Sequence, residues 1–492
     1  MEDNNRKVSS NLIWRFLERF GAQGVTFVVS IILARILDPT IYGTIAITII
    51  VTTILQVFID SGLGTALVQK KNADDADFST VFYFNLFLCT VLYVGLFFFA
   101  PLISAFFEKE ELTDIIRVLG ILLIISGFKN VQNSYVSRNL LFKKYFFATL
   151  GGTVTAAVVG IWMAYNGYGV WALVIQNLVN QTIDTIILWI IVKWRPKLSF
   201  SFTRLKILFS YGWKLLVSSL LNTIWTEARG LIIGKKYSSE NLAHYNKGEE
   251  YPKYATSALN SSIDSVLFPV MAKAQDEPEK VKAMTRRAIK VSSFCLFPMM
   301  IGLAVCAKPL VQLILTDKWL PCVPYLQIFC LSYAFHPIHN ANLNAIKAMG
   351  RSDYFLILEV IKKVVDAALI LIGMWLGVIW LAIGVLISNA VSQIVNSFPN
   401  IKLIRYSFFQ QFLDIVPAAC LSIVMGVLVF SISLFNLPPY VSLIIQIPLG
   451  IIVYIGGAIL LKNDSLKYVV YSVKNLFSRK KENNEQDTEV RL

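Results

Sequence analysis

The chain has 492 residues, of which 56% are hydrophobic and only 15% are charged, and its formal net charge is +14. This composition excludes an ordinary soluble protein, whose wetted surface needs more charged side chains, and it indicates that the lipid bilayer is the solvent. Nucleic acid is not needed to explain the positive charge, because basic loops that face anionic lipid head groups account for it.

Apolar stretches recur along the chain, each long enough to form a helix across a hydrocarbon core of about 30 Å. They are continuous rather than alternating, which favours helices over a β-barrel. We therefore predict an all-α polytopic membrane protein with about fourteen transmembrane helices. In chain order the predicted spans are 11–36, 41–60, 78–102, 114–137, 145–166, 169–192, 207–233, 248–271, 288–307, 323–347, 354–376, 377–400, 411–435 and 438–461.

The basic residues indicate how these spans are oriented. When the connectors are assigned alternately to the two sides, 29 of the 45 Lys and Arg residues fall on the side of the N-terminus, 7 on the other side and 9 within spans. The positive-inside rule then places both termini in the cytosol. The segment before the first span is polar and lacks an apolar core followed by a cleavage site, so we expect no removable signal peptide.

An internal echo connects the sixth and twelfth spans, where Asn177 and Gln181 recur at one offset as Asn389 and Gln393. A duplicated plan with a central site between halves is common among transporters. We therefore predict two six-helix lobes, 1–206 and 207–405, followed by two extra helices within 406–461 and a cytosolic tail, 462–492. Amides suit hydroxyl-rich ligands, so Asn177 and Gln181 are candidate substrate contacts, with helix packing as the alternative.

Five segments resemble the Wzx-type polysaccharide transport family. They are LARILDPTIYG (33–43), SGLGTALVQKK (61–71), GYGVWALV (167–174), VLFPVMAKAQ (266–275) and FLILEVIKK (355–363). The resemblance implies the multidrug/oligosaccharidyl-lipid/polysaccharide exporter fold, with two six-helix lobes around a central cavity. It also implies a flippase of the bacterial inner membrane that moves an oligosaccharide on undecaprenyl pyrophosphate to the periplasmic leaflet, for surface polysaccharide synthesis and beside a polysaccharide polymerase.

Ionisable residues at bilayer depth are costly, so they usually face a bundle interior or a water-filled cavity. In the first span Arg15, Glu18 and Arg19 share one helix face. We interpret the arginines as substrate ligands and Glu18 as a coupling group, with snorkelling to the interface as the alternative. Asp60 in the second span and Asp264 in the eighth lie on polar stripes without cations, which favours sugar contacts or coupling carboxylates.

The seventh span carries a polar stripe at spacings of four, four, four and three residues, composed of Lys214, Ser218, Asn222, Thr226 and Arg229. The spacing places them on one helix face over about 22 Å. We interpret Lys214, Asn222 and Arg229 as donors to phosphate and sugar hydroxyls, because Arg suits bidentate phosphate contact and Lys is a mobile point charge. The alternative is a polar seam that only packs helices.

The eleventh span contains Glu359, Lys362, Lys363 and Asp366 at i, i+3, i+4 and i+7. The spacing predicts two ion pairs, Glu359–Lys363 and Lys362–Asp366, on one helix face. We interpret this group as an inner gate or as a switch linked to a coupling ion, either a proton or sodium. A static buried network is the alternative.

We expect no cofactor, no metal and no covalent chemistry. His336 and His339 have no acidic or Cys partner nearby in the sequence, and Pro337 disturbs their helix. The sequence has no Walker GxxxxGK[ST] loop, so ATP does not drive transport from within this chain. The alternatives are a multidrug efflux transporter of the same superfamily, a peptidoglycan-precursor flippase, and a membrane polysaccharide polymerase or ligase, although the outer connectors are too short for a catalytic domain.

Overall fold

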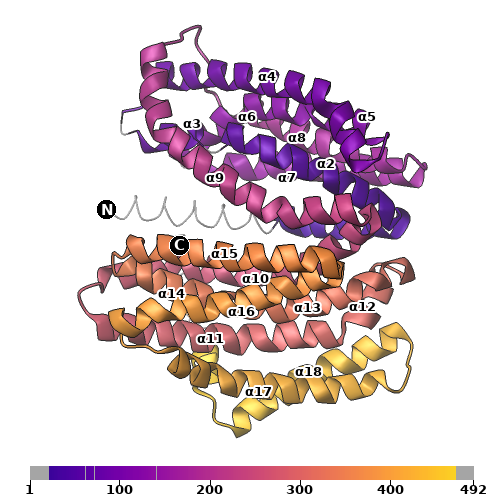
Figure 1. Cartoon of the computed structure of the whole chain (residues 1–492), viewed down its shortest axis with the longest axis vertical. Coiled ribbons are helices and arrows are strands. Elements are labelled where there is room, and N and C mark those ends of the chain that lie inside the picture. Colours follow the sequence, from indigo (N-terminus) through magenta and orange to yellow (C-terminus); the bar gives the residue numbers. More distant parts are fainter. Residues whose placement is uncertain (1–20, 61, 71, 140, 472–492) are drawn as a thin grey trace, which may run out of the picture. The chain divides into compact units, whose positions relative to one another are not determined.

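The computed structural model describes residues 21–60, 62–70, 72–139 and 141–471, which form helices joined by short connectors (Figure 1). No strand occurs in these ranges. The prediction of an all-α membrane protein is confirmed. The chain divides into two compact units between Ala243 and His244, within helix α10 (Ser239–Lys273). The lobe limits at residues 206 and 405 stay a prediction.

The first unit begins, in its described part, with a helix over Gly21–Ile36. The helices that follow are α2 (Pro39–Asp60), α3 (Leu63–Gln69), α4 (Asp75–Phe107), α5 (Leu112–Leu119), α6 (Ile121–Arg138), α7 (Phe142–Tyr165), α8 (Val170–Ile191) and α9 (Phe202–Lys236). Glycine allows α7 to lie directly on α8, since a Cβ on Gly152 would stand 2.7 Å from the carbonyl oxygen of Asn180.

The connector between α8 and α9 is held against the first unit by an aromatic contact. Trp194 in this connector is 6% exposed, and its ring stacks on Tyr135 of α6 with 6.1 Å between centroids. Gln132 Nε2 donates a hydrogen bond to the carbonyl oxygen of Trp194 at 3.2 Å. The connector therefore belongs to the packed core of this unit, and it fixes where α9 begins.

Carboxylates at the start of α4 complete this attachment. Asp74 caps the helix in a capping box with Asp77, which satisfies backbone N–H groups that the first turn leaves open. The Asp77 side chain is fully buried and accepts hydrogen bonds from Lys70 Nζ at 2.6 Å and Arg204 Nη1 at 3.1 Å. Arg204 also donates to Asp74 at 2.5 Å, so the first turns of α4 and α9 are joined by charge.

The second unit contains most of α10 and the helices α11 (Pro278–Val305), α12 (Ala307–Ile314), η1 (Asp317–Cys322), α13 (Val323–Tyr333), α14 (His336–Ala348), α15 (Ser352–Leu376), α16 (Val378–Leu403), α17 (Phe408–Ser433) and α18 (Pro439–Leu460). Helix α17 packs along α11 and against α18. The Tyr454 hydroxyl donates to the carbonyl oxygen of Phe294 at 2.8 Å. The last two helices are thus integral to this unit.

Within the described residues, every predicted span coincides with one helix or with two consecutive helices, and residues 11–20 of the first span lie outside them. Span 114–137 is divided into α5 and α6 around Gly120, and span 323–347 into α13 and α14. Among the described residues, eight helices are long and apolar enough to cross a membrane, and nine if the two segments of α9 count as one span. The number fourteen stays a prediction.

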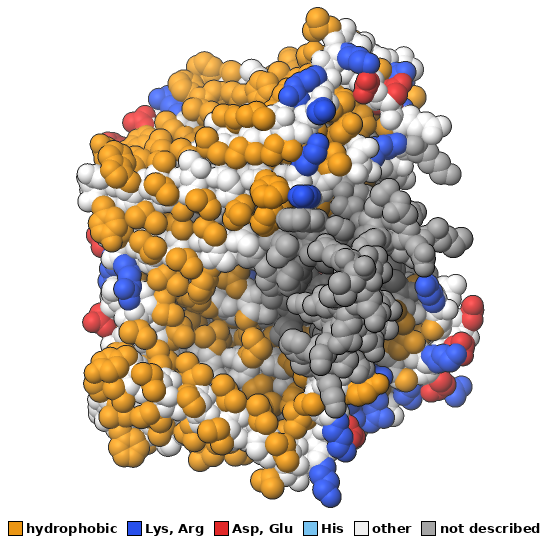
Figure 2. All heavy atoms as spheres, turned by 180° about the vertical axis from the view of Figure 1, so that it is seen from behind, with side chains coloured by type: hydrophobic (Ala, Val, Ile, Leu, Met, Phe, Trp, Pro, Cys, Tyr) orange, Lys and Arg blue, Asp and Glu red, His pale blue; other side chains and the backbone are white. Residues whose placement is uncertain are grey.

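Large hydrophobic side chains cover much of the face of the molecule that Figure 2 shows. Examples are Phe98, Trp375 and Ile452, which are 73%, 75% and 68% exposed. Apolar exposure on this scale is incompatible with a water-facing surface and is typical of helices that contact lipid. The chain is a multi-pass membrane protein.

Candidate functional site

The polar stripe of α9 lies outside the packed core of the first unit. Asn222 and Thr226 are exposed, and Arg229 is half-buried. Thr226 Oγ1 donates to the carbonyl oxygen of Asn222 at 2.9 Å, so it bonds within its own helix. A packing seam would bury these side chains against another helix. Asn222 and Thr226 are therefore not buried in such a seam, and the role of the stripe in ligand binding stays a prediction.

Some predicted residues cannot be placed. Outside the described residues lie Arg15, Glu18 and Arg19. The backbones of three others belong to helices α2, α9 and α10, but their side chains lie outside the described part of the chain; these are Asp60, Lys214 and Asp264. Their proposed roles stay predictions.

Helix α9 is bent by 54° between its segments Phe202–Ser210 and Leu215–Lys236. Gly212 lies in this bend and meets Gly62, at the break between α2 and α3. A Cβ on Gly212 would stand 2.9 Å from the carbonyl carbon of Gly62, and a Cβ on Gly62 would stand 2.9 Å from the carbonyl oxygen of Gly212. The two backbones touch only because both residues lack a side chain. The polar stripe continues on the segment beyond this contact.

A buried ion pair lies inside the first unit, between α6 and α8. Lys129 Nζ is 2.5 Å from Asp184 Oδ2, and the two residues are only 8% and 4% exposed. Lys129 also donates to Gln181 Oε1 at 3.2 Å, and Gln181 Nε2 donates to Ser126 Oγ at 3.3 Å. One charge thus compensates the other in an apolar helix bundle, where a single charge would be costly.

This pair shows what the sequence analysis missed. Lys129 is one of the nine basic residues within the predicted spans, and the sequence pattern assigns it no partner, although it is a lone basic residue in the apolar stretch of α6. A lone acid, Asp184, lies in the same way in α8, and opposite lone charges in two spans are a usable signal for contact. Gln181 is occupied by this network, whereas Asn177 Nδ2 donates to the carbonyl oxygen of Leu173 in its own helix at 2.8 Å.

In α15 the ion pair joins Glu359 and Lys362 at 2.5 Å. The predicted pairings of Glu359 with Lys363 and of Lys362 with Asp366 stay predictions. Residues three apart share a helix face as well as residues four apart do, so the spacing allows Glu359 either lysine. Asp366 is buried and Lys363 is half-buried, and each has contacts of its own.

Amides of α14, α16 and α17 form a second buried network in the same unit. Asn342 Nδ2 donates to Gln411 Oε1 at 2.8 Å, and Gln411 Nε2 donates back to Asn342 Oδ1 at 3.0 Å. Asn400 Nδ2 donates to Asn342 Oδ1 at 2.7 Å, and Gln393 Nε2 to Gln411 Oε1 at 3.4 Å. These side chains connect three helices, which favours packing over substrate contact for the amides of the twelfth span.

The histidines of α14 are also part of the packed interior. His339 Nδ1 lies 3.4 Å from Asn396 Nδ2, and the rings of His336 and His339 meet edge to face at 5.9 Å. In the described ranges, no group of three His, Cys, Asp or Glu side chains is arranged to hold a metal ion.

Known proteins with similar sequences take part in making bacterial polysaccharides. The succinoglycan biosynthesis transport protein ExoT of Rhizobium meliloti (strain 1021) is 24% identical over 75% of this chain and 75% of its own length. The lipopolysaccharide biosynthesis protein WzxC of Escherichia coli (strain K12) is also 24% identical, over 83% of both chains.

Solved structures share the fold. The lipid II flippase MurJ in an inward closed conformation matches with a TM-score of 0.75 and 16% identity, covering 92% of this chain and 100% of that chain. An inward-facing multidrug resistance MATE family transporter of the MOP superfamily matches with a TM-score of 0.62 and 17% identity, covering 78% and 94%. At these identities the likeness establishes the fold alone.

A family model described as polysaccharide biosynthesis protein matches residues 32–324, which is more than half of the chain. This range begins in the first helix described and ends in α13, so it includes both the α9 stripe and the Lys129–Asp184 pair. The chain therefore belongs to the polysaccharide biosynthesis protein family.

Proposed function

We propose that this chain is a flippase that moves an oligosaccharide linked to undecaprenyl pyrophosphate across the bacterial inner membrane, with both termini in the cytosol. Its family and the transport role in the name of ExoT support this reading. Transport follows alternating access of two lobes, a mechanism that suits a fold built from repeated halves. The product then serves a polysaccharide polymerase.

The observation that carries the proposal is the exposed polar face of α9. Asn222 and Thr226 are exposed, and Arg229 is half-buried, on a helix long enough to cross the bilayer. Leaving the exposed amide of Asn222 against hydrocarbon would cost several kcal/mol, so this face needs water or a polar ligand beside it. Sugar hydroxyls and a pyrophosphate supply acceptors for Asn and Arg donors, and Lys214, Arg15 and Arg19 would add charge.

Two ion pairs serve as coupling elements in this proposal. Lys129–Asp184 in the first unit is buried and Glu359–Lys362 in the second is half-buried, so binding of a proton or a sodium ion would change the balance of charge at each pair. Binding of such an ion to a carboxylate would release its lysine and shift the equilibrium between inward-open and outward-open states.

The experiment removes the cation of the stripe. In a strain that depends on this chain for surface polysaccharide, Arg229→Ala should abolish export, and Arg229→Lys should retain part of it because the charge remains. Lys206→Ala is the matched control, since Lys206 is an exposed cation of the same helix outside the predicted span. All three variants are compared at equal membrane abundance.

Two results would contradict the proposal. Normal export by Arg229→Ala would show that the stripe does not touch the substrate. Unchanged polysaccharide together with increased sensitivity to cationic drugs, after deletion of the whole chain, would favour multidrug efflux instead.

A further inference from the structure

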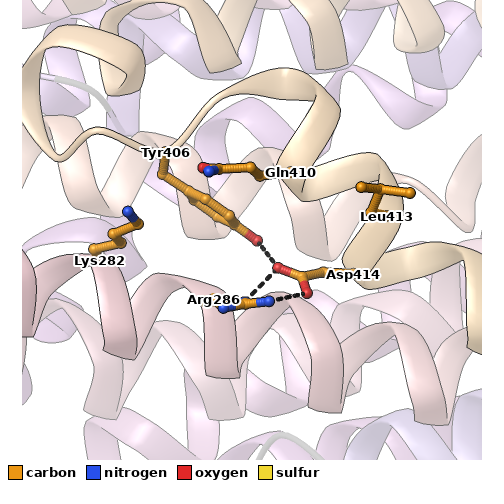
Figure 3. Close-up of a pocket in the computed structure, with 6 residues that line it drawn as sticks. All are labelled: Lys282, Arg286, Tyr406, Gln410, Leu413 and Asp414. Carbon is orange, nitrogen blue, oxygen red and sulfur yellow. Dashed lines mark hydrogen bonds and ion pairs between the residues drawn. The ribbon is translucent and has the colours of Figure 1, made fainter.

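A pocket of about 130 Å³ opens in the second unit where the first extra helix meets α11. Its lining comes from three segments, namely α11, the connector before α17, and the first two turns of α17 (Figure 3). The lining residues are Lys282, Arg286, Tyr406, Gln410, Leu413 and Asp414. None of them was singled out by the sequence, and all belong to one unit.

One carboxylate in this pocket serves several donors. Arg286 donates to Asp414 through Nε at 2.7 Å and Nη2 at 2.8 Å, and the Tyr406 hydroxyl donates to it at 2.8 Å. Lys290, one turn further along α11, lies 3.1 Å from the same carboxylate. Asp414 is therefore saturated, and its single negative charge faces two cations before Lys282 is counted.

Lys282 is a lining cation of the pocket that takes no part in the group around Asp414. It is half-buried, and in the described part of the chain no acceptor lies within bonding distance of its Nζ. Figure 3 shows it apart from the group around Asp414. Lys282, Arg286 and Lys290 together with Asp414 give a local formal charge of +2. A half-buried ammonium without a partner is costly, and an anion in the pocket would remove that cost.

The start of α17 adds to the attraction for an anion. Ser407 and Gln410 form a capping box, in which Ser407 Oγ accepts from the N–H of Gln410. The N–H groups of the two preceding residues remain open to other acceptors at the positive end of a 26-residue helix. This first turn borders the pocket, so cations and the helix end act together.

The surroundings select an anion that is attached to hydrocarbon. Next to the pocket, Phe409, Phe412 and Leu413 of α17 are 66%, 52% and 52% exposed. On the predicted topology, α11 and α17 both begin at the cytosolic interface, where anionic head groups lie. A phosphate diester with acyl chains would place its charge between Lys282 and Arg286 and its chains along α17.

We propose that this pocket binds the phosphate of an anionic bilayer phospholipid at the cytosolic surface and so anchors the two extra helices to the lobe. The site is separate from the α9 stripe, and it does not depend on which substrate the chain transports. The bound lipid would stabilise the contact between α11 and α17, which Arg286 and Asp414 already make.

The experiment measures the thermal unfolding of the detergent-purified full chain during titration with phosphatidylglycerol or with phosphatidylcholine. Phosphatidylglycerol should raise the unfolding temperature more, by mass action on the folded state. Lys282→Gln should weaken the apparent affinity about fivefold, since each basic residue near an anionic surface contributes about that factor. Lys280→Gln is the matched control, because Lys280 lies on the same helix and pairs with Glu277 away from the pocket.

Lys282→Gln was chosen because no partner is lost with it, so the variant should fold. Equal responses to the two lipids would overturn the proposal, as would equal responses of the two variants. Inorganic phosphate is the third titrant. If it produced the same stabilisation at the same concentrations, the ligand would be a free phosphate and not a lipid.

Discussion

Lys129 of α6 and Asp184 of α8 form an ion pair of 2.5 Å between two apolar helices of the first unit. Either change alone, Lys129→Met or Asp184→Asn, leaves an uncompensated charge or an unpaired donor in the interior. We expect each to lower stability by about 3 kcal/mol, and the double variant to recover part of this loss. Thermal unfolding of purified protein measures the effect. Single variants as stable as the wild type would show that the ion pair does not contribute to the stability of the fold.

The Glu359–Lys362 pair predicts a specific pattern of coupling in α15. A double-mutant cycle with Glu359→Gln and Lys362→Met should give an interaction energy of about 1 kcal/mol, because these side chains are in contact. The corresponding cycle of Glu359 with Lys363 should give a smaller value. Unfolding experiments on the wild type and the five variants decide between them. A larger coupling to Lys363 would restore the pairing that the sequence alone suggested.

The surroundings of Asp74 predict that the stability of the fold depends on pH. Its hydrogen bond from Arg204, followed by that from the Asp77 N–H, lowers the pKa of the carboxyl from 3.8 to about 2. A folded-state pKa below the unfolded one means that the ionised group stabilises the fold above pH 4, and that this contribution is lost as the pH falls toward 2. Asp74 is half-exposed, so solvent screening keeps the effect small.

The variant Asp74→Asn isolates this charge, because Asn still caps a helix. Its unfolding temperature should fall less than that of the wild type between pH 4 and pH 2. If the two proteins lost stability in parallel, Asp74 would not be the group that titrates.

The contact between Gly62 and Gly212 predicts that even one methyl group is harmful in the bend of α9. Gly212→Ala should lower the free energy of unfolding by about 1–3 kcal/mol, because the new Cβ would clash with backbone atoms, which cannot move aside as a flexible side chain can. Gly95→Ala in α4 is the control, since a Cβ there has no neighbour within 4 Å and alanine favours the helix. A Gly212→Ala variant as stable as this control would mean that the close approach is not maintained.

The sequence predicted the helices well because the bilayer imposes their length and composition. In the part of the chain that the structure describes, each hydropathic stretch is helical, with breaks at places such as Gly120 that hydropathy does not register. Five short segments, spread in order between the first described helix and α15, carried the resemblance to the family.

Side-chain partners were predictable only within a helix, and then ambiguously. Glu359 could reach Lys362 or Lys363 with equal ease, and the structure shows an ion pair with Lys362. Lys129 and Asp184 are 55 residues apart, so their contact depends on which helices are neighbours. The Asp414 pocket depends on how α17 docks on α11, which no single helix pattern contains.

The most direct test of the proposed function is translocation by the purified chain in proteoliposomes that contain an undecaprenyl-pyrophosphate-linked oligosaccharide. An impermeant reagent that modifies sugars is added outside, and the protected fraction is followed over time. We predict that the wild-type chain brings the substrate of the inner leaflet to the outside, so that the protected fraction falls with time. With Arg229→Ala the protected fraction should stay as high as in protein-free liposomes. A wild-type chain that leaves the inner pool protected, under proton and sodium gradients of either direction, would contradict the assignment as a flippase.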